Sequence, residues 1–249
     1  MKEHLIGILV ALPQEAHALF GKLGWSRSGM FPVKVERFHD FLVMIAVSGQ
    51  GKARAAAATK FLLKSNPLFL INMGVAGALA PDLASGDLVI PGEVTDQAEK
   101  IGLASPVKQV LDNLLGSLGV DFKKGLLVTS SETVDSPEAK IALFKASGAI
   151  AVDMEAFAMA EVCKRSSLPC FVVKAITDSQ SQTIPKAITS CLSETGHISF
   201  ARFTITLLSR PWLIPRLVEM QKSFKSAIFS LEQVKVLLSA NLSRDFLTS

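Results

Sequence analysis

The chain has few cysteines and none in a closely spaced pair. Of its 249 residues only Cys163, Cys170 and Cys191 are cysteines. Their number and the absence of CxxC spacing argue against a disulfide framework and against a zinc site, so free thiols are expected. The four histidines are scattered without HExxH or paired spacing, which gives a metal centre no support. We therefore predict no metal and no cofactor, and chemistry that depends on carboxylates, backbone groups and shape.

Long uninterrupted hydrophobic runs are also missing. The most apolar stretch, residues 67–80, is broken by Asn72 and several glycines. No run reaches the roughly 18 residues that a membrane span requires, so no transmembrane helix is expected. The first four residues, Met1 to His4, lead straight into a strand-like run without a small-residue cleavage site, which is unlike a signal peptide. The expected location is the cytoplasm.

Over most of the chain neither basic nor acidic residues are in excess. The formal net charge is +4 and no basic run is interleaved with aromatic residues, so we expect no nucleic-acid partner. Residues 201–249 carry seven lysines and arginines against three acidic residues, which is the whole of the excess. The composition is 49% hydrophobic and 19% charged, which is typical of a folded chain with a sizeable core.

Strand-like and helical patterns alternate along the chain. Short apolar, β-branched runs predict strands at residues 4–12, 41–47, 68–72, 88–90, 125–128, 149–153 and 170–177, while helical periodicity predicts helices at 14–22, 52–63 and 154–164. A glycine-rich turn, Gly74 to Gly77, is expected after the third strand. The alternation predicts an α/β fold in three layers, with a largely parallel mixed sheet flanked by helices. Ligands of such sheets bind outside the carboxyl ends of the strands.

Acidic residues occupy several of these strand ends. Glu15, Glu155 and Asp178 each follow a run too apolar to face solvent. Carboxylates there also cap helix N-termini, and for Asp153 we favour that structural role. For the other three together we favour function, because acids that converge on one crevice must repel one another or shift their pKa values.

Five motifs in order carry a family resemblance. They are Ala11-Leu12-Pro13-Gln14-Glu15-Ala16, Ser48-Gly49-Gln50-Gly51-Lys52, Asn72-Met73-Gly74-Val75-Ala76-Gly77 with Gly86-Asp87-Leu88-Val89 behind it, Ala151-Val152-Asp153-Met154-Glu155-Ala156, and Lys174-Ala175-Ile176-Thr177-Asp178. Over roughly residues 4–200 the chain resembles the nucleoside phosphorylase and nucleosidase superfamily. Within it, the motifs most resemble the methylthioadenosine/S-adenosylhomocysteine nucleosidases and the hopanoid-associated phosphorylase-like nucleosidases.

The resemblance implies a role for each acid. Asp178 would protonate or hydrogen-bond N7 of a purine, Glu155 would bind ribose hydroxyls, and Glu15 would orient and activate a water at C1′. Such groups suit the reaction, because glycosidic cleavage passes through an oxocarbenium-like state and leaves charge on the departing base.

The resemblance also implies substrate contacts and an assembly. Met154 would pack on the sugar, although a methionine at a helix start is more often core. Gly74, Val75, Thr133 and Val134 complete the predicted substrate-binding set, and a homodimer is usual in the family.

The base-binding stretch departs from the family pattern. Residues 129–134 occupy the place where family members hold the base through backbone groups and a stacked aromatic, and no aromatic is present there. Phe157 or Phe38 would replace it only if the fold brought either one near.

The choice between water and phosphate as attacking group turns on cationic and hydroxyl ligands. Phosphorylases of the family carry arginines and a hydroxyl at places where this chain has Leu12-Pro13-Gln14, Asn72 and Val75. Phosphate needs such donors, and Glu15 would repel it, so we predict hydrolysis. The resemblance implies a purine nucleosidase that releases adenine from a 5′-substituted adenosine derivative, such as methylthioadenosine, S-adenosylhomocysteine or an adenosyl-lipid. A phosphate-dependent phosphorylase and a non-catalytic nucleoside-binding protein are the alternatives.

The C-terminal segment has a composition of its own. Near residues 209–211 the α/β pattern gives way to a basic, amphipathic helical segment, Trp212 to Leu238. We predict a catalytic domain at 1–209 and a helical tail at 210–249 packed on it. The alternative is a helix on an anionic membrane surface, since the tail resembles the C-terminal extension of the hopanoid-associated branch.

Overall fold

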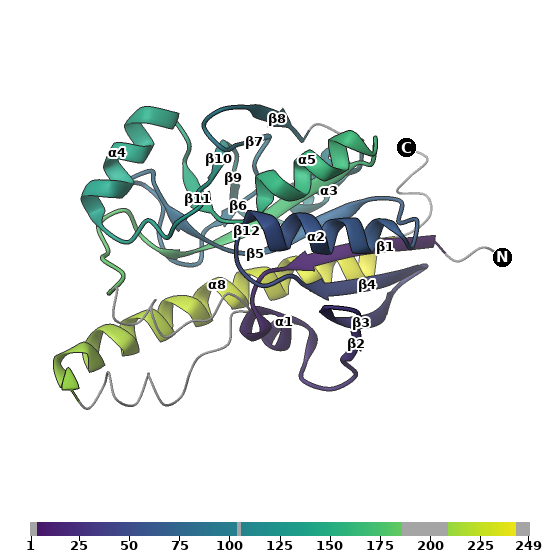
Figure 1. Ribbon diagram of the computed structural model, residues 1–249, viewed down its shortest axis with the longest axis horizontal. Helices are drawn as coiled ribbons and strands as arrows, with labels where there is room; N and C mark the ends of the chain where they lie inside the picture. The colour runs from purple at the N-terminus through teal and green to yellow at the C-terminus, as the bar shows by residue number, and fades with distance from the viewer. Residues whose placement is uncertain (1–3, 104–105, 186–208, 243–249) are drawn as a thin grey trace.

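A mixed 12-stranded sheet is covered by helices on both faces (Figure 1). The computed structural model describes residues 4–103, 106–185 and 209–242. The strands are β1 His4–Val10, β2 Ser26–Ser28, β3 Phe31–Phe38, β4 Phe41–Val47, β5 Leu70–Ala78, β6 Leu88–Val89, β7 Glu93–Thr95, β8 Lys100–Gly102, β9 Phe122–Lys123, β10 Leu126–Thr129, β11 Ala151–Asp153 and β12 Cys170–Asp178. The helices are α1 Pro13–Phe20, α2 Lys52–Leu63, α3 Pro106–Ser117, α4 Pro137–Ser147, α5 Ala156–Arg165, a 3-10 turn at Pro211–Leu213, and α8 Ile214–Asn241. The expected fold class is confirmed.

The centre of the sheet is parallel and several outer pairs are antiparallel. Strand β1 pairs in parallel with β4 and with the first half of β5, and β12 runs parallel along the other side of β5. Strand β11 runs antiparallel to the second half of β5, and β3 extends the sheet antiparallel to β4. The hairpin β2–β3 was not predicted, because β2 is a polar, fully exposed edge strand with no apolar run to reveal it.

Side chains alternate between two cores, one on each face of the sheet. In β1, Ile6 and Ile8 pack with α1 and α8, whereas Leu9 packs with α2 and α5. In β12, Val173 belongs to the core with α1 and α8, and Val172 to the core with α2 and α5. This period of two, with both faces apolar, is what a central strand covered by helices on each side requires. The three-layer arrangement therefore follows from the strand sequences themselves.

The predicted glycine-rich turn at residues 74–77 is wrong, because this stretch continues strand β5. Strand β12 pairs with β5 through Gly77, and β11 pairs with Gly77 and Ala78, so both edges of the stretch are held. Its glycines provide space. A Cβ atom on Gly74 would lie 3.2 Å from Oε2 of Glu15, and one on Gly77 would lie 3.1 Å from Oδ2 of Asp178.

Helix α8 has two dissimilar halves. Its second half inserts Ala227, Leu231, Val234 and Leu238 into the core that also contains β1. In its first half, up to residue 226, no side chain is buried, and Figure 1 shows this half running beyond the edge of the sheet. None of the helices among the described residues is long and apolar enough to span a membrane.

Two of the three cysteines lie within the described residues. Cys163 and Cys170 are buried and free, as the spacing predicted. Cys191 lies outside the described residues.

Candidate active site

A cavity of about 160 Å³ lies where β1, β5, β11 and β12 end. Its lining includes five carboxylate residues, Glu15, Glu132, Asp153, Glu155 and Asp178, and no lysine or arginine among the residues that the structure describes there. The three predicted catalytic acids therefore share one cavity. Glu155 reaches it from β11, which is antiparallel to β5, because the carboxyl end of β11 lies beside the second half of β5.

Glu15 is fixed by backbone N–H groups on two elements. Pro13 begins α1 and places Glu15 in its first turn, where Oε2 accepts a hydrogen bond from Leu12 N at 3.0 Å. Oε1 accepts one from Val75 N at 3.1 Å, across from β5. Burial raises the pKa of Glu15, and this outweighs the opposing effects of Lys174 and of the N–H donors. The helix-capping role and the place in the cavity thus belong to the same side chain.

Glu155 joins the start of α5 to the start of α2. It is the N-cap residue of α5, yet its side chain makes no capping bond there. Instead Oε1 accepts a hydrogen bond of 2.8 Å from the backbone N of Gly51, which precedes α2. Burial, with smaller contributions from Asp153 and Glu15, raises the pKa of Glu155 to about 7, against the lowering effects of Lys174 and the Gly51 N–H. A carboxyl with this pKa changes charge near neutral pH.

Asp153 performs the structural role that its position predicted. Its Oδ2 accepts from Ala156 N at 2.9 Å in the first turn of α5, and its Oδ1 accepts from Thr129 Oγ1 at 2.7 Å. The same Oδ2 lies 2.9 Å from Nζ of Lys174 in an ion pair whose two side chains are each 1% exposed. Asp153 therefore ties β10, β11, α5 and β12 together at the wall of the cavity.

Lys174 was not assigned a role from the sequence. Burial lowers its pKa, but Asp153, Glu155 and Glu15 together outweigh burial and leave the pKa above its ordinary value. The ammonium thus counters the mutual repulsion of the acids without lining the cavity. A single lysine inside the apolar run 170–177 was the available signal, because lysines are almost never fully buried unless paired.

Asp178 is the last residue of β12, rather than following the strand as predicted, and it lines the cavity. Its Oδ1 accepts a hydrogen bond from Thr177 Oγ1 at 2.7 Å, and its Oδ2 pairs with Nζ of Lys140 at 2.5 Å. Lys140, on α4, was missed by the sequence analysis as well.

Four of the five predicted substrate-contact residues line the cavity, and the fifth lies next to Glu15. Val75, Thr133, Val134 and Met154 line the cavity. Gly74 lies behind Glu15. Gln50, which lines the cavity too, donates through Nε2 to Sδ of Met154 at 3.5 Å and was not predicted.

No aromatic residue is among the described residues that line the cavity. Phe157 and Phe38 are buried in the two cores, 5% and 3% exposed, and neither replaces the missing stacking partner. The described residues also contain no group of three or more His, Cys, Asp or Glu side chains arranged to hold a metal ion.

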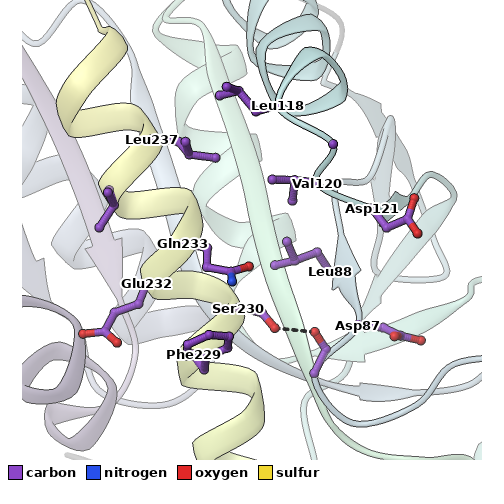
Figure 2. Close-up of a pocket in the computed structure, with 13 residues that line it drawn as sticks. Asp87, Leu88, Leu118, Val120, Asp121, Phe229, Ser230, Glu232, Gln233 and Leu237 are labelled. Carbon is purple, nitrogen blue, oxygen red and sulfur yellow. Dashed lines mark hydrogen bonds between the residues drawn. The ribbon is translucent and has the colours of Figure 1, made fainter.

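A larger hollow of about 850 Å³ lies elsewhere, between the second half of α8 and the segments around Leu88 and Val120 (Figure 2). Its lining is mostly apolar, and the carboxylates of Asp121 and Glu232 lie on opposite sides of it. The hydrogen bond from Ser230 Oγ to Gly86 O, 2.6 Å long, ties α8 to its floor. Converging polar groups with perturbed pKa values mark a reactive site better than volume does, so the smaller cavity is the candidate.

The sequence matches one known protein family over most of its length. The model of the phosphorylase superfamily matches residues 5–194. The chain is similar to the 5′-methylthioadenosine/S-adenosylhomocysteine nucleosidase of Buchnera aphidicola subsp. Baizongia pistaciae, 29% identical over 72% of this chain and 79% of that protein. It is similar to the nucleosidase of the same name from Staphylococcus aureus strain MRSA252, 30% identical over 70% of this chain and 86% of that protein.

Solved structures agree on the fold. Futalosine hydrolase of Helicobacter pylori superposes with a TM-score of 0.74 at 17% identity, over 95% of this chain and 97% of that one. The H. pylori 5′-methylthioadenosine/S-adenosylhomocysteine nucleosidase gives 0.75 at 17% identity, over 96% and 98%. With the family model matching most of its length, the chain belongs to the phosphorylase superfamily.

Proposed function

We propose that the protein is a purine nucleosidase that hydrolyses the N-glycosidic bond of a 5′-substituted adenosine derivative and releases adenine. The observation that carries the proposal is a small cavity lined by five carboxylates and, among its described residues, by no lysine or arginine. Carboxylates suit a reaction that develops positive charge on the sugar. The relatives named as nucleosidases of methylthioadenosine and S-adenosylhomocysteine support the same substrate class.

Each acid has a task in this proposal. Asp178, in its protonated form, donates a proton or hydrogen bond to N7 of the purine, so that the base departs without a full negative charge, while Glu15 takes the proton that the attacking water loses. Glu155 accepts hydrogen bonds from the ribose hydroxyls, with Met154 against the sugar. Glu15 holds and activates the water that attacks C1′, which its raised pKa favours because a stronger base takes a proton more readily.

The neighbouring residues hold the nucleoside around these acids. Val75 contributes its backbone N–H to Glu15, and Gly74 leaves room for that carboxylate. Thr133 and Val134, before α4, line the cavity and contact the base.

Water rather than phosphate is the attacking group in this account. A phosphate dianion requires charged or bidentate donors. In the described part of the chain the lysines nearest the acids, Lys140 and Lys174, are 0% and 1% exposed and are already paired with carboxylates. A phosphate beside Glu15 and Glu155 would meet negative charge.

The direct test is a substrate panel. Purified protein is incubated with methylthioadenosine, S-adenosylhomocysteine and adenosine, with and without phosphate, and free adenine is measured by chromatography. The proposal expects adenine without added phosphate. Sugar 1-phosphate formed only with phosphate would indicate the phosphorylase, and binding without any turnover would indicate a nucleoside-binding protein.

We further propose a homodimer in the cytoplasm, with residues 1–209 as the catalytic unit and residues 210–249 as a helical tail packed on it. The family resemblance supports the dimer, and the buried second half of α8 supports the packing. Light scattering of the purified protein gives the assembly, and a mass of one chain would contradict the dimer.

We also propose that the first half of α8 makes peripheral contact with anionic membranes. The 3-10 turn before it exposes Trp212, and the helix itself exposes Ile214 and Val218; these side chains are 69%, 50% and 46% exposed. Arg216, which pairs with Glu219 at 3.3 Å, is exposed beside them. Co-sedimentation with phosphatidylserine vesicles tests this contact: binding should weaken with salt and in W212S, and its absence at low salt would contradict the proposal.

A further inference from the structure

Helix α4 packs Leu143 and Phe144 partly against the cores, but its one buried residue is a lysine. Among its 11 residues Lys140 is the one that is fully buried, with 0% of its side chain exposed, while most of the helix faces solvent. A lysine costs much to bury unless its charge is paired, and a surface helix normally turns apolar residues inward. The position therefore requires a reason other than packing.

The ammonium of Lys140 has a partner for each of its three donors. Besides Oδ2 of Asp178, Nζ donates to Ser179 O at 2.8 Å and to Gln182 O at 2.9 Å. A lysine ammonium has three hydrogens and no acceptor, so its hydrogen-bonding capacity is used completely. Lys140 thus ties the segment after β12 to α4, and a backbone bond from Ile184 N to Asp135 O, 2.8 Å long, closes the same junction.

These contacts leave the Asp178 carboxyl one orientation. Thr177 Oγ1 donates to Oδ1, Lys140 holds Oδ2, and the absence of a side chain at Gly77 leaves the space in which the carboxyl lies. The Asp178 side chain is 16% exposed and lines the cavity, whereas Lys140 does not line it. Lys140 can therefore act on a bound nucleoside only indirectly, through Asp178 or through the segment after β12 whose carbonyl groups it holds.

We propose that Lys140 is a positioning residue for glycosidic cleavage, whose ammonium fixes the Asp178 carboxyl in the orientation that meets N7 of the purine. The inference rests on the proposed function, in which Asp178 acts on the leaving base. Its physical basis is that displacing a catalytic group by about 1 Å lowers the rate roughly 10²-fold. Loss of the residue that holds the group in place should therefore lower kcat. Substrate binding depends less on that orientation, because Glu155 and Met154 hold the sugar.

The experiment is a double-mutant cycle on adenine release. Wild type, K140M, D178N and K140M/D178N are compared, with K145M as a control that removes an exposed lysine from the same helix. We expect K140M to lower kcat by about 10- to 100-fold with KM changed less than about threefold, and K145M to match wild type. In the D178N background, K140M should change kcat less than about twofold, because its route to the substrate is already lost.

Several results would overturn the inference. A folded K140M with wild-type kcat would remove Lys140 from the reaction. If K140M lowers kcat by the same factor in the D178N background as in wild type, its effect is a general structural one. If K140M does not fold, K140Q, which lacks the positive charge but keeps a polar group, replaces it in the cycle and is judged by the same two criteria. If the wild-type protein releases no adenine, the proposed function itself is refuted. If the wild-type protein is active but the K140M and D178N losses are independent, only the inference about Lys140 is refuted.

Discussion

The ionisation of Glu155 should make recognition of the ribose hydroxyls depend on pH. Its pKa is raised to about 7, chiefly by burial. In the proposed function only the carboxylate accepts hydrogen bonds from both hydroxyls, so this recognition should weaken as pH falls below 7. For one group with this pKa, the ionised fraction changes little between pH 8 and pH 7 and falls about tenfold per pH unit below pH 7, and hence about 100-fold between pH 8 and pH 5.

The assay compares two substrates at each pH, because Glu15 also has a raised pKa and would contribute to any single profile. The kcat/KM for a riboside is divided by that for its 2′,3′-dideoxy analogue, after subtraction of the uncatalysed rates. Glu15 and Asp178 act on both substrates, so the ratio isolates Glu155. It should rise with pH up to about 7 and then level off, since kcat/KM reports the free enzyme.

The control is E155Q, whose ratio should be low and independent of pH. A wild-type ratio that does not change between pH 5 and pH 8 would refute the reasoning. So would an E155Q variant that retains the wild-type rise.

Three further predictions concern turnover and stability. D178N should remain folded but with a lower melting temperature, because the buried ammonium of Lys140 loses its charged partner, and it should lose about 10²- to 10⁴-fold in kcat, measured by adenine release, because an amide supplies no proton to N7. The raised pKa of Glu155 means that the folded state binds its proton more tightly than the unfolded state between about pH 4.5 and 7, so the free energy of unfolding should fall as pH rises through that window. Over that window the free energy of unfolding, measured by urea titration at each pH, should fall by up to about 3 kcal/mol more in wild type than in E155Q. Equal falls in the two proteins would contradict the assignment. L231A, at a side chain 0% exposed in α8, should lower the free energy of unfolding by about 2–5 kcal/mol, whereas F229A, at a side chain 62% exposed, should change it little; equal effects would contradict the packing of α8.

Most of the fold could be predicted because its central strands are apolar on both faces. Phe41–Val47 and Lys52–Leu63 were predicted with their observed bounds, since a buried strand and an alanine-rich helix have strong local signals. Edge and short strands such as β2 and β9 have no such signal. The residues 74–77 were misassigned because glycines usually mark turns, whereas here tertiary pairing holds them in a strand.

The candidate site was predictable only in part. Glu15, Glu155 and Asp178 could be singled out because each carboxylate follows an apolar run, and the structure brings them into one cavity. The buried lysines were not recognised, since their partners are distant in sequence. Lys140 lies 38 residues from Asp178 along the chain, and α4, the helix that carries it, was itself not predicted.

The most direct test of the central claim is the fate of the oxygen in the attacking water. Methylthioadenosine is incubated with the protein in ¹⁸O-enriched water, and the products are separated and examined by mass spectrometry under conditions that limit exchange at the anomeric carbon. The account predicts free adenine without label and a methylthioribose that carries one ¹⁸O atom, at a rate that is unaffected by phosphate. A methylthioribose 1-phosphate that forms only when phosphate is present, or no adenine from any riboside in the panel, would contradict it.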